Sequence, residues 1–415
     1  MAASSRQYEN SMVAILGFAV GIMAFEQASG FYLMPFIKSA LQLDNTEIGL
    51  IVSAYYVAFA VSSFVASLIM DILGKRKLCF LVVIISISCF SVLSGFAHSF
   101  GTLLFARALM GAVEAPIFAT TQSIVAIESS PQRLGINTGI VGSLVGNAMG
   151  GLMAPVLLVK VMSVYGWHVG FFLVLVPGLI CSALAAWRLR EPRFHASLNP
   201  VTIVDSGSKN RFVGVLKFRN IWLCAAICCC FAVYTGVGFS FLPLYYVNAR
   251  HFSSSQMGLF MSVLGMSAIF YSYALPAASD RFGRRPVMIA AGLLSTICPL
   301  AVLYYSGPMA VLAALLLVGW ALAGSGSLFI GTIPSETVSS ASVSTAVGLV
   351  VAIGALVGGL AGPAIAGWSA DHWGLRAPLL LLLVVASLVG LISVALRETA
   401  PSAIMSNAKT ERMTL

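Results

Sequence analysis

Residues 71–77 read Asp-Ile-Leu-Gly-Lys-Arg-Lys, and residues 280–286 read Asp-Arg-Phe-Gly-Arg-Arg-Pro. The second stretch begins 209 residues after the first. Each stretch separates two long apolar segments and joins an acidic residue, a glycine and a basic cluster. The recurrence of this combination indicates that the chain contains two copies of one unit.

The two copies extend well beyond these stretches. Matches at an offset of 208 or 209 residues follow one another in chain order. Gly30, Phe31, Pro35, Gly49, Ser53, Glu128, Gly146, Gly150, Gly151, Pro155 and Gly166 recur as Gly238, Phe239, Pro243, Gly258, Ser262, Glu336, Gly354, Gly358, Gly359, Pro363 and Gly374. Because the offset changes by only one residue, chance matches among 38 glycines do not explain the pattern. We therefore predict two related halves.

The composition is that of a membrane protein. Hydrophobic residues make up 59% of the chain and charged residues 9%, whereas a soluble domain has about 25% charged residues. Twelve apolar segments reach the length of about 20 residues that a spanning helix needs. They lie near 12–37, 46–70, 78–97, 101–127, 137–162, 168–188, 220–247, 256–279, 287–305, 309–333, 343–370 and 376–396. Lipid offers no partner to backbone polar groups, so we predict an all-α membrane fold.

The polar residues define the domain organisation. We predict an N-terminal six-helix bundle at 1–188, a cytoplasmic linker at 189–219, a C-terminal six-helix bundle at 220–400 and a cytoplasmic tail at 401–415. With the amino terminus inside, 18 of the 23 Lys and Arg residues fall on the inner side. Cytoplasmic loops are enriched in such residues, so both termini are predicted to be cytoplasmic. We also expect no cleavable signal peptide, because the start lacks a basic region.

Several classes of function do not fit the sequence. The net charge of +9 lies mainly in short inner loops, so it does not indicate nucleic-acid binding. The eight cysteines lack zinc-type spacing with histidine, and we predict no metal and no cofactor. No Ser/His/Asp set and no sizeable domain outside the membrane is evident, so an enzyme or a receptor is not favoured.

Three ionisable residues lie inside apolar segments, far from any loop: Glu26, Arg107 and Glu114. A charge at bilayer depth costs roughly 2.5–3.5 kcal/mol on insertion scales, so it marks a functional cavity by default. Arg107 and Glu114 are seven residues apart, which places them on one helix face about 10 Å apart. This spacing leaves room for a small solute or water between them.

Over essentially its whole length the chain resembles the major facilitator superfamily, whose DRxGRR signature is similar to residues 71–77 and 280–286. The resemblance implies twelve transmembrane helices in two pseudo-symmetric bundles, alternating access, and a cavity lined by helices 1, 4, 7 and 10. It also implies a monomer in a bacterial inner membrane. We predict conformational latches at Asp71, Gly74, Lys75, Arg76, Asp280, Arg281, Gly283, Arg284 and Arg285. The alternative is topology anchoring by positive charge alone.

Residues 107–116, with Arg107, Gly111 and Glu114, resemble the anion:cation symporter family within that superfamily. Members move sugar acids and other small carboxylates with protons or sodium. The acid–Arg pair of that family in helix 1 is represented here by Glu26 and Gln27, so Gln27 stands where the family has the arginine of a second anion contact.

From this resemblance and from residue chemistry we assign roles. Arg107 would bind the substrate carboxylate, since a guanidinium stays charged and grips an anion with two hydrogen bonds. Glu114 would be the principal proton site and Glu26 a second coupling acid. Weaker candidates for substrate hydrogen bonds are Gln27, Tyr55, Asn147 and Tyr234, for which ordinary interhelical bonding is the favoured alternative. Arg107 could instead be a structural charge paired with either acid.

The predicted function is a proton-coupled symporter that imports a small organic anion, such as the monocarboxylate of a sugar acid or an aromatic acid. Sodium is the alternative coupling ion. A drug:proton antiporter of the same superfamily is the alternative function. Residues 146–151 are close to the antiporter GPxxGG pattern, but Asn147 stands at the proline position.

Overall fold

The computed structural model is all-helical in the part of the chain that it describes, residues 2–73, 75–130, 133–191, 214–339 and 342–400. The predicted all-α class is therefore confirmed. The chain falls into two compact units, Met1–Leu198 with Pro243–Met266, and Asn199–Leu242 with Ser267–Leu415. We refer to them as unit 1 and unit 2. Most of the predicted linker, residues 192–213, and the tail from residue 401 lie outside the described residues.

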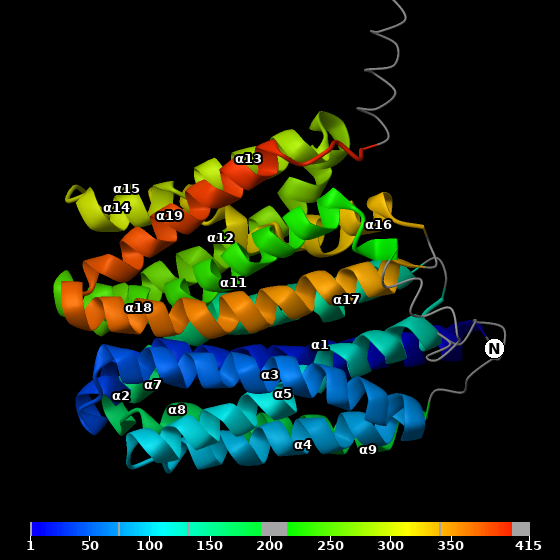
Figure 1. The fold of residues 1–415 in the computed structure, drawn as a ribbon. Helices are drawn as coiled ribbons and strands as arrows, with labels where there is room; N and C mark the ends of the chain where they lie inside the picture. Colours follow the sequence, from blue (N-terminus) through cyan, green and yellow to red (C-terminus); the bar gives the residue numbers. More distant parts are fainter. Residues whose placement is uncertain (1, 74, 131–132, 192–213, 340–341, 401–415) are drawn as a thin grey trace, which may run out of the picture. The chain divides into compact units, whose positions relative to one another are not determined.

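The helices that precede the linker belong to unit 1 and run alongside one another (Figure 1). The most extensive helix–helix contact is between α3 and α5, and α4 packs on both α5 and α9. The elements are α1 Ala2–Tyr32, α2 Met34–Leu41, α3 Asn45–Leu73, α4 Arg76–Gly95, α5 Phe100–Glu128, α6 Leu134–Gly139, α7 Ala154–Tyr165, α8 His168–Phe172 and α9 Leu175–Arg188, with π-helical turns η1 Ile140–Leu144 and η2 Asn147–Met153.

The helices after the linker repeat this organisation, with α13 packed on α19 and α14 on α15. The elements are α11 Arg219–Leu244, η3 Tyr245–Ala249, α12 Ser254–Phe282, α13 Arg284–Leu294, α14 Ile297–Tyr304, α15 Met309–Gly319, η4 Ala321–Gly324, η5 Ser327–Thr332, α16 Ile333–Thr337, α17 Val343–Ile353, η7 Gly354–Gly359, α18 Leu360–Trp373 and α19 Arg376–Val394. The amino-terminal part of α12 and η3 belong to unit 1.

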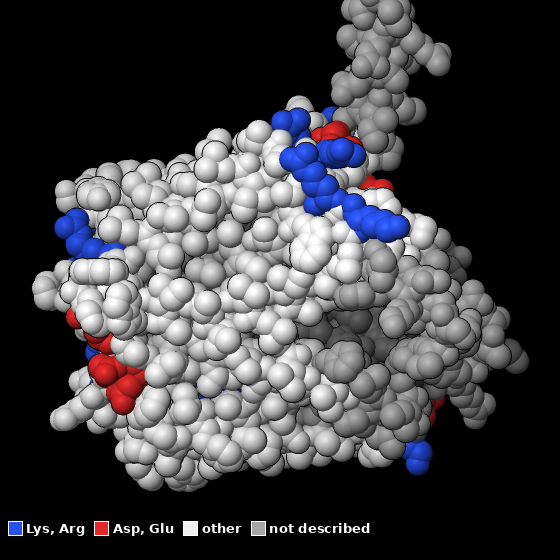
Figure 2. Space-filling view, in the orientation of Figure 1, with Lys and Arg blue, Asp and Glu red and all other residues white. Residues whose placement is uncertain are grey.

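Eleven helices among the described residues are long and apolar enough to cross a membrane. The tenth predicted segment, 309–333, differs because its continuous apolar helix ends at Gly319. A 3-10 turn, a π-helical turn and α16 follow, in a stretch that contains Gly319, Gly324 and Gly326. Glycine loses more backbone freedom in a helix than any other residue, so this glycine-rich stretch favours a break. In Figure 2 the charged side chains lie in small groups, and large parts of the visible surface carry no charge.

Glycine at two matched positions lets helices approach closely within each unit. A Cβ on Gly150 would lie 2.8 Å from the carbonyl carbon of Ala24 in α1, and a Cβ on Gly358 would lie 2.9 Å from that of Cys229 in α11. Both glycines sit in π-helical turns, η2 and η7, at the same place in the repeat. The repeat therefore preserves a packing contact. Small residues at such positions allow the backbones of two membrane helices to approach closely.

Candidate functional site

Three helices of unit 1 bring the buried ionisable residues together. Glu26 lies on α1, Tyr55 on α3, and Arg107 and Glu114 on α5. Their exposed fractions are 0%, 2%, 3% and 0%, respectively. All four lie within candidate membrane spans. The four side chains are therefore buried among the helices of unit 1.

Arg107 forms an ion pair with Glu26, with 2.6 Å between Nη1 and Oε1. Its guanidinium also faces the rings of Tyr55 and Phe171, at 5.4 and 6.0 Å from the two ring centroids. Aromatic faces attract a cation, most strongly where water is excluded. A buried guanidinium needs such partners because desolvation of an isolated charge is very costly.

A directed chain of hydrogen bonds leads from Gln27 to Glu114. The Gln27 side-chain amide donates to the Tyr55 hydroxyl over 2.7 Å. The Tyr55 hydroxyl donates in turn to Oε2 of Glu114. Because the hydroxyl has only one proton, it cannot donate to substrate while it donates to Glu114. Gln27 and Tyr55 thus hold Glu114 in place in this arrangement.

The two carboxyl groups also face each other. The Glu26 and Glu114 side chains are close enough to influence each other electrostatically. Oε2 of Glu26 and Oε1 of Glu114 are both buried without a hydrogen-bond partner. An ionised carboxylate only accepts hydrogen bonds, so two facing carboxyl groups can bond only when one carries a proton. The geometry therefore suits one proton shared between Glu26 and Glu114.

Two glycines create the space that the cluster occupies. A Cβ on Gly30 of α1 would lie 2.6 Å from Cζ of Arg107. A Cβ on Gly111 of α5 would lie 3.0 Å from the carbonyl carbon of Tyr55, where α5 crosses α3. Both distances are shorter than ordinary contacts, so each position needs glycine. Gly30 in particular is a site residue that the sequence reasoning used only as a repeat marker.

The remaining two predicted substrate contacts lie elsewhere. Asn147 begins η2 and is half-buried, and its side chain makes no hydrogen bond within the described part of the chain. Tyr234 is fully buried in unit 2, where its hydroxyl lies 2.9 Å from the Ser295 carbonyl oxygen and 3.2 Å from that of Gly319. Its proton is thus committed to the backbone, as in ordinary interhelical bonding.

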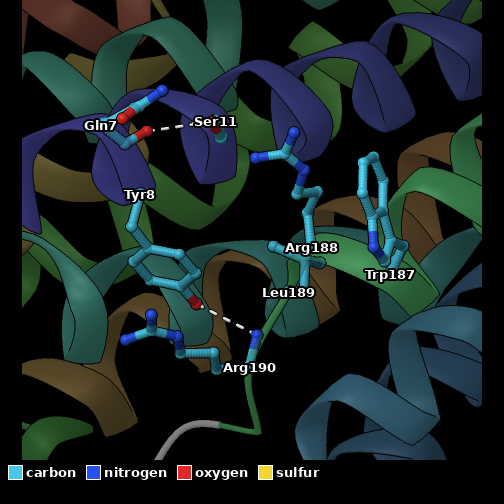
Figure 3. A pocket seen from close by; sticks show the side chains of 7 residues that line it. All are labelled: Gln7, Tyr8, Ser11, Trp187, Arg188, Leu189 and Arg190. Carbon is cyan, nitrogen blue, oxygen red and sulfur yellow. Dashed lines mark hydrogen bonds between the residues drawn. The ribbon is translucent and has the colours of Figure 1, made fainter. Parts of the chain in front are cut away.

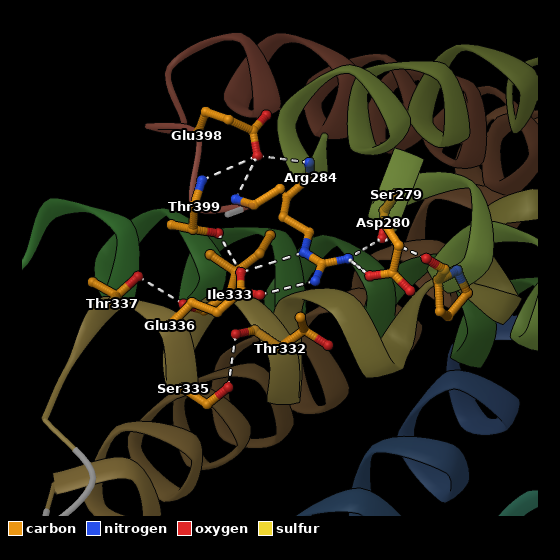
Figure 4. Close-up of polar contacts among 12 residues, drawn as sticks. Ser279, Asp280, Arg284, Thr332, Ile333, Ser335, Glu336, Thr337, Glu398 and Thr399 are labelled. Carbon is orange, nitrogen blue, oxygen red and sulfur yellow. Dashed lines mark hydrogen bonds and ion pairs between the residues drawn. The ribbon is translucent and has the colours of Figure 1, made fainter. Parts of the chain in front are cut away.

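The second of the two basic stretches forms an ion network at the end of α12 (Figure 4). Nη1 of Arg284 lies 2.5 Å from Asp280 Oδ1, and Nη2 lies 2.8 Å from Glu336 Oε1. Nε also donates to Glu336 Oε2 over 3.3 Å, so one edge of the guanidinium binds both carboxylate oxygens of Glu336. Asp280 is 67% exposed and Glu336 only 21%, so water weakens the Glu336 pair less.

Glu398 completes this network by capping α13. Its carboxylate accepts from the backbone N–H groups of Arg284 and Arg285 over 2.8 and 3.1 Å. It also accepts from those of Thr399 and Ala400 over 3.0 and 2.9 Å. Burial raises the pKa of Glu398, but these backbone hydrogen bonds outweigh burial and hold the pKa below its usual value.

The sequence reasoning did not place Glu336 and Glu398 in this site. Glu336 appeared there only as a repeat match, which was the available signal. Of the other predicted latch residues, Arg281 is exposed and Gly283 is buried at a φ of 95°. That backbone conformation favours glycine and turns the chain between α12 and α13.

In the first stretch, Gly74 and the Asp71 side chain lie outside the described residues. Lys75 precedes α4 and Arg76 begins it. The backbone N–H of Lys77 donates to Oε1 of Glu191 over 3.1 Å, which matches the capping of α13 by Glu398. Among the described residues, no group of three or more His, Cys, Asp and Glu could hold a metal ion.

Comparison with known proteins identifies the family. The model of the Major Facilitator Superfamily matches residues 16–358 and 277–412. The chain belongs to the Major Facilitator Superfamily. Membership of this transporter superfamily, together with the transporter names of its relatives, indicates a multi-pass membrane transporter rather than an enzyme.

Several curated members of the superfamily are similar to this chain. A hexuronate transporter of Bacillus subtilis (strain 168) is 26% identical over 260 residues, which cover 60% of this chain and 59% of that protein. A probable 4-methylmuconolactone transporter of Cupriavidus pinatubonensis is 24% identical, covering 69% and 66%. A probable sulfoacetate transporter of Cupriavidus necator is 23% identical, covering 60% of each. The match thus spans less than two thirds of each of these relatives.

Solved structures of the superfamily share the fold. A bacterial homologue of the human lysosomal transporter Spinster, inward-facing and unoccupied, has a TM-score of 0.78 at 19% identity and covers 93% of this chain and 97% of that one. The nucleoside transporter NupG (D323A mutant) has a TM-score of 0.77 at 13% identity and covers 92% and 99%. Both likenesses concern the fold alone.

Proposed function

We propose that this superfamily member is a proton-coupled symporter that imports a small organic anion, with Arg107 as the anion site. The observation that carries the proposal is a buried guanidinium beside two carboxyl groups that can share a proton. The relatives named for hexuronate and sulfoacetate transport support an organic acid as the substrate class. They also weigh against the drug:proton antiporter.

The charge count of the cluster suggests how proton and anion are coupled. Arg107 carries one positive charge, and Glu26 and Glu114 with one shared proton carry one negative charge, so the cluster is neutral. An arriving carboxylate must compete with Glu26 for Arg107. A second proton, bound by the carboxyl pair, would release Glu26 from Arg107 and balance the charge of the anion. One proton per singly charged anion follows, because a net charge inside the membrane is costly.

The two halves would serve this cycle as the superfamily fold suggests. We propose that the six-helix bundles at 1–188 and 220–400, joined by the linker at 189–219, alternate about the site as a monomer. Both termini would lie on the cytoplasmic side of a bacterial inner membrane, because loops rich in Lys and Arg face the cytoplasm. The Asp280–Arg284–Glu336 network would act as a latch between states.

The test uses purified full-length protein in liposomes, with hexuronate, sulfoacetate and 4-methylmuconolactone as candidate substrates. An acidic exterior should drive accumulation of at least one singly charged acid among them. An electrical potential alone should not, because the proposed symport of one proton with one singly charged anion is electroneutral. Replacing protons by a sodium gradient tests the coupling ion. If no acid accumulates while inside-out vesicles with an acidified lumen load a cationic dye, the antiporter is correct.

A further inference from the structure

Unit 1 holds a polar cavity whose lining residues are not part of the buried cluster. It occupies about 360 Å³ between the start of α1 and the end of α9 (Figure 3). Its walls consist of Gln7, Tyr8 and Ser11 on one side and Trp187, Arg188, Leu189 and Arg190 on the other. The two arginines give this cavity a positive charge.

Neither guanidinium has an acidic partner at ion-pair distance among the described residues. Glu128 is the acid that interacts with Arg190 electrostatically, without an ion pair. Each guanidinium instead lies over a ring, with Arg188 Cζ 4.3 Å from the Trp187 centroid and Arg190 Cζ 4.6 Å from that of Tyr8. Stacking fixes the orientation of a guanidinium but leaves its hydrogen-bond donors available.

The Tyr8 hydroxyl adds a further donor. It accepts a hydrogen bond from the Arg190 backbone N–H over 3.1 Å, so its own proton is available to a ligand. The cavity thus offers guanidinium and hydroxyl donors but no carboxylate. Such a set fits the oxygens of a phosphate group, which arginine contacts with paired hydrogen bonds.

The cavity also lies at the membrane surface. Its residues come from the ends of two candidate spans, Arg6–Tyr32 and His168–Arg188. Trp187 is 73% exposed at that end, as is typical of tryptophan at the boundary between lipid and water. The headgroup of a membrane lipid can therefore reach this cavity.

We propose that this cavity binds the phosphate group of an anionic phospholipid. The phosphate would lie between the Arg188 and Arg190 guanidiniums and accept from the Tyr8 hydroxyl. Basic pockets between membrane helices at the cytoplasmic surface are suited to such headgroups. This site is independent of the proposed transport reaction, and it uses only residues that the transport proposal leaves without a role.

The test measures retention of phosphatidylglycerol by the purified full-length protein with native mass spectrometry, using phosphatidylcholine as the neutral reference lipid. Each arginine near an anionic lipid should contribute about 5-fold in affinity, so Arg188→Gln with Arg190→Gln should lower it by about 25-fold. The matched control, Lys217→Gln with Arg219→Gln, removes the same charge at the start of α11 and should leave retention unchanged.

A second variant separates a defined pocket from general surface attraction. Ser11→Trp fills the cavity and keeps both arginines, so it should lose phosphatidylglycerol although its charge is unchanged. Ser11→Trp also tests the proposed lipid site if the double arginine variant does not fold. Retention equal to wild type in Ser11→Trp, or an equal loss in the control, overturns the proposal. So does thermal stabilisation by inorganic phosphate without any preference for phosphatidylglycerol, which would assign the pocket to a free anion.

Discussion

The interiors of the two units differ although their scaffolds repeat. In unit 1, Glu26 contacts Arg107 and faces Glu114. In unit 2, Tyr234 holds the position that matches Glu26, and its hydroxyl bonds to backbone carbonyls beside Trp320. A duplicated fold can therefore keep its glycine contacts while the charged Glu26 of one copy is matched by the uncharged Tyr234 of the other. This difference places the candidate proton and anion chemistry in unit 1.

In contrast to the interiors, the starts of α4 and α13 are capped in the same way in both units. Glu191 caps α4 through Lys77, and Glu398 caps α13 through Arg284 and Arg285. The cap satisfies backbone N–H groups that every helix start leaves without partners. Such a need is common to both copies, whereas the Glu26–Arg107 ion pair belongs to unit 1.

The largest effect is expected for Arg107→Ala in unit 1. Removal of the guanidinium leaves Glu26 without its partner in a buried site, which costs about 3–5 kcal/mol unless the carboxyl takes up a proton. Acid uptake into liposomes should fall to background, whereas Arg107→Lys should retain part of it. Unchanged uptake in Arg107→Ala would exclude the anion-binding role.

Glu114→Gln should separate coupling from translocation. The amide cannot bind and release a proton, so accumulation driven by a pH gradient should be lost. Counterflow exchange of labelled for unlabelled substrate needs no net proton movement and should continue. Loss of both activities would make Glu114 a structural or binding group instead.

Gly30→Ala should disturb the same site by steric overlap alone, without removing a charge or a hydrogen bond. The added methyl group collides with the Arg107 guanidinium, and overpacking of this kind costs about 1–3 kcal/mol. Substrate affinity and the thermal unfolding temperature should both decrease. Gly101→Ala, in the same helix as Arg107, meets nothing within 4 Å and serves as the control. Equal effects of the two substitutions would contradict the steric argument.

Glu398→Gln tests the helix cap of unit 2 through pH. The folded-state pKa of Glu398 is depressed, so its contribution to stability is present above the unfolded value near 4.5 and is lost as pH falls through the folded value. The thermal unfolding temperature of wild type should exceed that of the variant at neutral pH. The difference should shrink below pH about 4.5. A difference independent of pH would point to packing.

The smallest effect is expected for Tyr234→Phe in unit 2. The loss of one buried hydrogen bond costs about 1 kcal/mol, and proton-driven uptake should remain. Tyr55→Phe in unit 1 is the matched change, and it should alter the pH profile of uptake because the hydroxyl contacts Glu114. Equal pH profiles for the two variants would remove the distinction between the units.

Local sequence determined the helices, the repeat and the identity of the buried charges. Apolar segments must form helices in lipid, and an ionisable residue within one is visible from the sequence alone. The seven-residue spacing of Arg107 and Glu114 also predicted one face of one helix. The resemblance to the superfamily added the expected cavity helices, and the family match confirms the superfamily.

Only the tertiary structure decided which groups meet. Glu26 reaches Arg107 across 81 residues of sequence, and Arg284 reaches Glu336 across 52. The cavity between Tyr8 and Arg190 joins residues that are 182 positions apart. Spacing within one helix fixes a face, but it does not fix which neighbouring helix covers that face. That choice depends on where glycines such as Gly30 and Gly111 allow close packing, because side-chain volume elsewhere keeps the helices apart.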